Sequence, residues 1–113
     1  MSVLQYSSAK QKDVLVVTIS GSLDAETAPK FSKKLTEEIE KGSKKVLCNL
    51  KDIEFIASAG LGVLISANQS LHKKGGELKL AGLSEKITKI FKVMGFINLF
   101  KIFKDNESGI ASF

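Results

Sequence analysis

The first part of the chain alternates between β-branched runs and a helical pattern. Val3–Ser7 and Asp13–Gly21 are short runs of apolar and β-branched residues separated by a few polar ones, and they predict an antiparallel hairpin. Between Thr27 and Lys41 apolar residues recur at spacings of three and four, and Gly42 follows as a stop signal. The residues expected to form the buried face of this amphipathic helix are Ala28, Phe31, Leu35 and Ile39.

The same alternation of strand and helix continues to the end of the chain. The expected elements are a strand over Lys45–Leu50, a connection over Lys51–Ser58, a helix to about Lys74, a strand over Glu77–Ala81, a helix from Ser84 to about Met94, a strand around Leu99–Phe103 and a short helix after Asp105. Ser84 and Asp105 are typical N-cap residues, and glycines follow the two longer helices.

Two of these helices carry apolar positions whose orientation is predicted. In the helix ending near Lys74, one stripe is expected to face the core and a second, smaller face to point elsewhere. The core stripe consists of Leu61, Leu64, Ile65 and Leu71, and the other face of Val63, Ala67 and Ser70. In the last helix, Ile110 and Phe113 are expected to face inward.

The order of elements predicts an α/β fold with a mixed, mostly parallel sheet. Strands joined through helices become parallel neighbours with right-handed crossovers, and the first strand adds an antiparallel edge. About four helices cover this sheet. Binding sites in such sheets form at the carboxyl ends of the parallel strands. The segments Gly21–Ala28 and Asp52–Gly60 leave the second and third strands there, so they are the candidate site.

Length and composition fit one domain spanning residues 1–113. The chain has 113 residues, of which 43% are hydrophobic, which is enough for a single core. No segment approaches the ~18 apolar residues of a membrane span, and Met1–Lys12 lacks a signal-peptide core, so we expect a cytoplasmic protein without membrane insertion. The single cysteine, Cys48, lies in the apolar run Val46–Leu50 and is expected to be a small buried hydrophobe.

The positive charge favours an acidic partner over nucleic acid. Seventeen Lys and Arg residues against twelve Asp and Glu give a net charge of +5. The lysines occur in small groups at expected helix ends or solvent faces, such as Lys33 with Lys34 and Lys73 with Lys74, and no aromatic residue that is expected to be exposed is interleaved with them. Direct nucleic-acid binding is therefore not expected.

The sequence offers no catalytic constellation. The only histidine, His72, lies near the end of an expected helix and is predicted to be exposed. Neither a Cys/His cluster with metal-ligand spacing nor a glycine-rich phosphate loop occurs. We therefore predict a binding protein that is not an enzyme and has no metal or other cofactor.

Two segments carry a resemblance to a known family. Ile53-Glu-Phe-Ile-Ala-Ser-Ala-Gly-Leu-Gly-Val-Leu64 resembles the signature of STAS domains, in which a hydrophobic pair leads into Asp-Ser-Ser/Ala-Gly-Leu-Gly at a helix start. Gly21-Ser-Leu-Asp-Ala-Glu-Thr27 is similar to the Gly-x-Leu-Asp turn of the same family, at the expected distance upstream. A weaker match is Gly75-Gly-Glu-Leu-Lys-Leu-Ala81, which runs into a helix started by serine. The resemblance covers essentially the whole chain in register.

Among STAS domains the chain looks most like the bacterial anti-sigma factor antagonists. This resemblance implies binding to an anti-sigma factor of the serine kinase type, release of the sigma factor, and loss of binding when the motif serine is phosphorylated. The serine at the matching position is Ser58. The implied partner-binding residues are Asp24, Ala57, Ser58, Ala59, Gly60, Leu61 and Val63.

Several alternatives stay open at this point. The family usually has an acidic residue where this chain has Ala57, which leaves open a STAS scaffold that is not phosphorylated, or a subunit of a signalling or transport complex. Ser58 is also interpretable as a plain helix N-cap, and Asp24 as a residue that shapes a turn. Gly60 and Gly62 are also explained by close backbone approach at the helix start, which requires no role in partner binding. The sequence leaves open the oligomeric state, the sigma factor and the identity of the partner.

Overall fold

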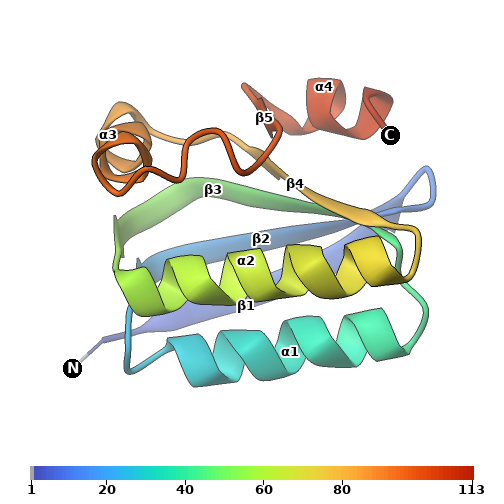
Figure 1. Cartoon of the computed structure of the whole chain (residues 1–113), viewed down its shortest axis with the longest axis horizontal. Coiled ribbons are helices and arrows are strands. Elements are labelled where there is room, and N and C mark those ends of the chain that lie inside the picture. Colours follow the sequence, from blue (N-terminus) through green and yellow to red (C-terminus); the bar gives the residue numbers. More distant parts are fainter. Residues whose placement is uncertain (1) are drawn as a thin grey trace.

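A β-hairpin forms one edge of the sheet in the computed structural model, which describes residues 2–113 (Figure 1). β1 (Leu4–Gln11) pairs antiparallel with β2 (Val14–Leu23). The two residues of the turn, Lys12 and Asp13, both have positive φ, 50° and 61°, as a two-residue turn between twisted strands requires. The predicted hairpin is confirmed, and both strands extend beyond the predicted runs.

Three further strands complete a five-stranded sheet. β3 (Lys45–Ile56), β4 (Glu77–Ala81) and β5 (Ile102–Phe103) follow in the order β1-β2-β3-β4-β5. The pairs β2–β3, β3–β4 and β4–β5 are all parallel, and each connection contains a helix. The predicted mixed, mostly parallel sheet with an antiparallel edge strand is therefore confirmed.

The helices cover the two faces of the sheet unequally (Figure 1). α1 (Ala28–Glu40), α2 (Ser58–Lys73) and α3 (Glu85–Val93) bury their apolar sides in one large core cluster, and α4 (Asn106–Ala111) packs on the opposite face. The N-caps predicted at Ser84 and Asp105 are confirmed. Ser84 Oγ accepts a hydrogen bond from the Ile87 N–H at 3.2 Å, and Asp105 Oδ1 accepts one from the Ser108 N–H at 2.9 Å. Ile110 and Phe113 pack inward as predicted.

The buried face of α2 differs in detail from the predicted stripe. Leu61, Leu64 and Leu71 are buried as predicted, but Ile65 is only half-buried. Ala67, which was expected to point elsewhere, is buried. The physical reason is that α1 packs beside α2, so that the face of α2 toward α1 is covered as well as the face toward the sheet.

Two strand boundaries were predicted incorrectly. β3 was expected to end at Leu50 but continues to Ile56, because its second half pairs with β2 through register shifts and buries Ile53 and Ile56 in the core. Alternation is broken at those shifts, so the pattern no longer indicates a strand. β5 was expected over Leu99–Phe103 but contains only Ile102 and Phe103. The preceding Leu99 is exposed.

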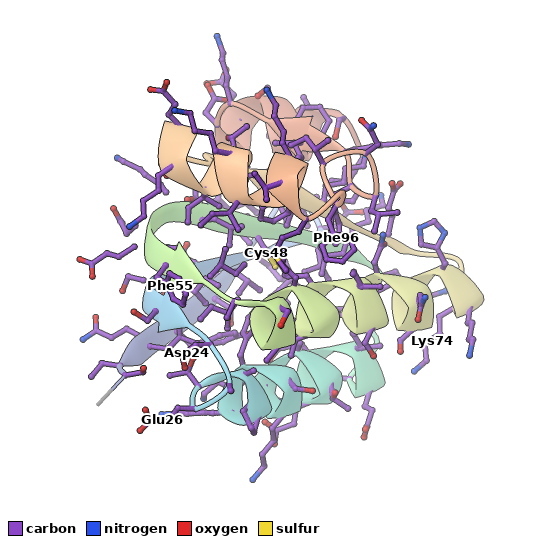
Figure 2. The ribbon with its side chains drawn as sticks, turned by 60° about the vertical axis from the view of Figure 1, so that its left-hand side comes forward. Asp24, Glu26, Cys48, Phe55, Lys74 and Phe96 are labelled. Carbon is purple, nitrogen blue, oxygen red and sulfur yellow. The ribbon has the colours of Figure 1, made fainter. Side chains whose placement is uncertain are left out.

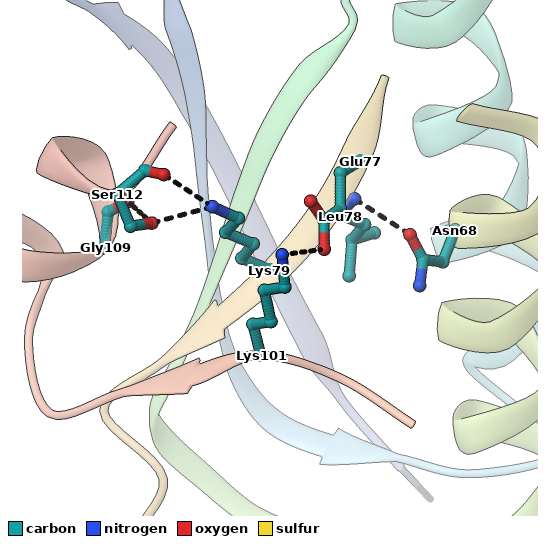
Figure 3. A network of polar contacts seen from close by, with 7 residues as sticks. All are labelled: Asn68, Glu77, Leu78, Lys79, Lys101, Gly109 and Ser112. Atoms are coloured by element: carbon teal, nitrogen blue, oxygen red, sulfur yellow. Dashed lines mark hydrogen bonds and ion pairs between the residues drawn. The ribbon is translucent and has the colours of Figure 1, made fainter. Parts of the chain in front are cut away.

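A buried lysine joins α4 to the sheet (Figure 3). Lys79, on β4, is only 4% exposed, and its Nζ donates to both the carbonyl oxygen and Oγ of Ser112 at 2.9 Å. The same Nζ lies 4.3 Å from the ring centre of Phe113, a cation–π distance. Desolvation by burial lowers the pKa of this ammonium group. A hydrogen bond of 3.0 Å from the Leu78 N–H to Asn68 Oδ1 ties β4 to α2 in a similar way.

Candidate functional site

The carboxyl ends of β2 and β3 bring the two candidate segments together. Leu23 and Ile56, the last residues of these strands, are paired in the parallel register. The Ala57 N–H then donates to the Leu23 carbonyl oxygen at 2.9 Å. The connection from β2 to α1 and the first turn of α2 therefore leave the same edge of the sheet, as expected for a binding site in this fold.

Asp24 shapes the connection from β2 to α1. Its Oδ1 accepts hydrogen bonds from the N–H groups of Glu26 at 3.0 Å and Thr27 at 3.2 Å, and its Oδ2 accepts one from the Ser2 hydroxyl. The hydrogen bond from Ser2, followed by those from the loop, lowers the pKa of this carboxyl group. Of the two interpretations left open by the sequence, turn formation is therefore observed directly.

Two residues that support this turn were not identified from the sequence. Thr27 Oγ1 accepts a hydrogen bond from the Asp24 N–H at 3.0 Å and donates one to the Ser22 carbonyl at 2.8 Å. Ser2 contributes its hydroxyl to Asp24 and its backbone N–H to Glu26 Oε2 at 3.0 Å. The sequence could have identified Thr27, because Asp and Thr three residues apart commonly close such a turn. The contact from Ser2 is long-range and carries no local signal.

The motif serine lies at the first residue of α2. Ala57 is the N-cap, with extended backbone angles (φ −110°, ψ 171°), and no side chain within residues 2–113 caps this helix. The interpretation of Ser58 as the N-cap is therefore wrong by one position. Ser58 is exposed, as is Ala59. An uncapped helix start with an exposed hydroxyl presents free backbone N–H groups and the positive end of the helix dipole.

The remaining predicted site residues lie beneath or beside this surface. Gly60 and Leu61 are buried, and Val63 is half-buried. Gly60 and Leu61 therefore shape the surface from below, whereas Ala57, Ser58 and Ala59 form its accessible part.

A large apolar side chain lies at the same edge. Phe55, at the end of β3, is 46% exposed. Figure 2 shows it at the end of the sheet where Asp24 and Glu26 also lie. Sequence analysis included Phe55 in the family signature but gave it no role. Its exposure results from the register shifts in β3, which no apolar pattern predicts.

The single cysteine and the single histidine lie away from this edge. Cys48 is fully buried, as predicted, and burial raises the pKa of its thiol to about 12. His72 is exposed near the end of α2 that lies opposite Ser58. Among residues 2–113, no three His, Cys, Asp or Glu side chains are grouped in a way that would hold a metal ion. In the same range no helix has the length and apolar character needed to cross a membrane.

Comparison with known proteins places this geometry in a family. Residues 5–109 match the model of the STAS domain. An anti-sigma-B factor antagonist of Bacillus subtilis is 35% identical over 94 residues, which cover 83% of this chain and 85% of that protein. The relatives are thus named for antagonism of another protein and not for a reaction.

Solved structures share the same fold. A putative anti-sigma factor antagonist from Thermotoga maritima has a TM-score of 0.86 at 24% identity and covers 95% of this chain and 92% of its own. The unphosphorylated form of the anti-sigma factor antagonist SpoIIAA has a TM-score of 0.82 at 19% identity, covering 96% and 95%. From the match over residues 5–109 and from the relative in Bacillus subtilis, the chain belongs to the STAS domain family.

Proposed function

We propose that this protein is an anti-sigma factor antagonist that acts in the cytoplasm. It binds an anti-sigma factor of the serine kinase type through the edge formed by Asp24 and the start of α2, and thereby frees the sigma factor. The name of the relative in Bacillus subtilis supports this proposal. So does the exposed surface at the carboxyl ends of β2 and β3, which contains the family motif.

We further propose that phosphorylation of Ser58 ends this binding. The observation that carries the proposal is the exposed Ser58 at the first residue of an uncapped helix. A kinase has access to the hydroxyl, and the free N–H groups and dipole of the helix stabilise the resulting phosphate. One structural neighbour, SpoIIAA of Bacillus, has been solved in a phosphorylated form, with a TM-score of 0.73.

The physical effect of the phosphate is electrostatic and steric. Phosphorylation adds about 1.5 to 2 negative charges to a surface that a partner must desolvate. Asp24 and Glu26 already make the neighbouring connection acidic. Docking is therefore opposed by the cost of desolvating the added negative charge and by the bulk of the phosphate, with no need for a rearrangement of the sheet or helices.

Binding titrations test the first part of the proposal. The purified protein is titrated against each anti-sigma factor kinase encoded in its source genome, and one of them should form a complex. Ser58→Asp should weaken that complex at least about tenfold, a cost of about 1.4 kcal/mol. The matched control is Ser70→Asp, which adds the same charge at an exposed position of the same helix. Equal binding by Ser58→Asp and wild type would contradict the proposal.

Mass mapping after incubation with the same kinase tests the second part. Modification should occur at Ser58 and be absent in Ser58→Ala, which should still bind. A stable complex in which Ser58 is never modified would instead support the alternative of a scaffold or complex subunit that is not switched by phosphorylation.

A further inference from the structure

A shallow groove runs between the end of β3 and α3, beside the surface proposed above. Its lining residues are Phe55, Ser84, Glu85, Lys86, Lys89 and Ile90. Phe55 is 46% exposed, and Ile90 is half-buried against the core. The groove therefore combines an accessible aromatic ring with an aliphatic side chain, an arrangement that can hold one apolar side chain of a partner.

The helix that lines this groove, α3, has a net positive charge. α3 carries three lysines, Lys86, Lys89 and Lys92, against the single acidic residue Glu85. The ion pairs found within residues 2–113 use other lysines, so these three are not neutralised by the described part of the chain. A ligand that places carboxylates beside Lys86 and Lys89 gains favourable electrostatic energy, whereas a basic ligand is repelled.

The groove is continuous with the proposed partner surface. Phe55 precedes the N-cap of α2 by two residues and Ser58 by three. In Figure 2 Phe55 lies below α3, at the same edge of the molecule as Asp24 and Glu26. The edge thus has an acidic half on the connection from β2 to α1 and a basic, partly apolar half on α3.

We propose that this groove docks an acidic segment of the partner that carries an apolar anchor residue. The anchor packs on Phe55 and Ile90, and neighbouring carboxylates lie against Lys86 and Lys89. The identification of the partner as an anti-sigma factor rests on the proposed function. The chemistry of the segment follows from the groove alone, because its charge and its exposed aromatic ring select the ligand.

Titration of variants against the anti-sigma factor tests the groove within the complex. Phe55→Ala should weaken binding at least about tenfold, as expected for an aromatic anchor. The double variant K86E/K89E should weaken it about tenfold or more at low salt, with a smaller difference at about 0.3 M salt because the charges are exposed. The matched control is K73E/K74E, which makes the same charge change at the opposite end of α2. A thermal melt of each variant verifies that it remains folded.

A synthetic peptide of alternating Glu and Leu residues tests the groove without the anti-sigma factor. In NMR titrations its addition should shift the amide signals of Phe55, Lys86 and Lys89 in the wild type. In K86E/K89E the signals of Phe55 and of the two replaced positions should not shift. A peptide of alternating Lys and Leu residues should not produce these shifts. The proposal is overturned if the Glu and Leu peptide shifts signals elsewhere, or if both peptides shift the same signals.

The two proposals fail in different ways. If Ser58→Asp breaks the complex but Phe55→Ala and K86E/K89E leave it unchanged, the groove proposal fails and the proposed function stands. If no anti-sigma factor binds while the Glu and Leu peptide still maps to Phe55, Lys86 and Lys89, the proposed function fails and the groove stands.

Discussion

The first turn of α2 rests directly on Leu23 through Gly60. A Cβ atom at Gly60 would lie 2.5 Å from Leu23 Cγ and 2.9 Å from the Leu23 carbonyl oxygen. Only glycine therefore allows the helix to approach the end of β2 this closely. Because Ala57 also donates to the Leu23 carbonyl, the position of Ser58 relative to the neighbouring connection depends on this contact.

Gly60→Ala should destabilise the protein and move the start of α2. The added methyl meets a backbone oxygen and a buried side chain, and overpacking of this kind costs about 1 to 3 kcal/mol. Urea unfolding followed by circular dichroism measures the loss. Gly62→Ala is the matched control, since no atom of the described residues outside this stretch of helix lies within 4 Å of a Cβ there. That change should stabilise the helix by about 0.5 to 1 kcal/mol. Equal stability of Gly60→Ala and wild type would contradict this view of the contact.

Most of the fold could be predicted because its elements follow simple periodic patterns. The hairpin, α1 and the caps at Ser84 and Asp105 all depend on local sequence. The second half of β3 could not be predicted, because its side chains are directed by register shifts against β2. The burial of Ala67 depends on the packing of α1 against α2, which no single helix pattern contains.

The site was predictable where a motif defines it and not where tertiary contacts do. Asp24 and Ser58 were found from the family motifs and lie at one edge of the sheet. The contact from Ser2 to Asp24 joins residues far apart in sequence, and the exposure of Phe55 follows from an irregular strand. The alternative interpretation of Ser58 as the N-cap rested on the preference of serine for that position, yet the backbone places Ala57 there.

Asp24 should make the stability of the protein sensitive to acid. Its carboxyl pKa is lowered in the folded protein, first by the hydrogen bond from Ser2. A depressed folded-state pKa stabilises the protein above the unfolded pKa of about 3.9, and this stability is lost as the pH falls through the folded value. Asp24→Asn removes the titration, so it should lose less stability than wild type below about pH 4. Urea unfolding at a series of pH values measures the difference between the two proteins in free energy of unfolding. This difference should be constant between about pH 6 and pH 8. A parallel loss in both proteins below about pH 4 would contradict the assignment.

Lys79 should hold α4 against the sheet. Lys79→Met keeps the aliphatic stem but removes the two hydrogen bonds to Ser112, which were 2.9 Å each. Relief of the buried charge offsets part of the loss, so the net cost should be about 1 kcal/mol. Amide hydrogen exchange should become faster in α4 and stay unchanged in α1. The control Lys101→Met removes an exposed lysine that forms a 3.6 Å ion pair with Glu77 and should change stability by less than about 0.5 kcal/mol. Equal exchange in α4 for both variants would exclude this role of Lys79.

Ala57→Asp should stabilise α2 and tests the departure from the family motif. Ala57 already has the extended backbone of an N-cap but supplies no side-chain acceptor. An aspartate there accepts a hydrogen bond from the first turn, a gain of about 1 kcal/mol, and its charge also interacts favourably with the helix dipole. Ala57→Asn separates these effects because it caps without charge. Ala59→Asp adds the charge in the first turn without a cap and should gain less, about 0.3 to 1 kcal/mol. Thermal or urea unfolding ranks the three variants, and no gain from Ala57→Asp or Ala57→Asn would show that the cap position is misassigned.

With a kinase that modifies Ser58, restoring the acidic residue of the family motif through Ala57→Asp should also raise the rate of phosphorylation. An unchanged rate would mean that the kinase does not recognise the residue at position 57. Ala57 would then give no reason to prefer an unphosphorylated scaffold over a protein that is switched by phosphorylation.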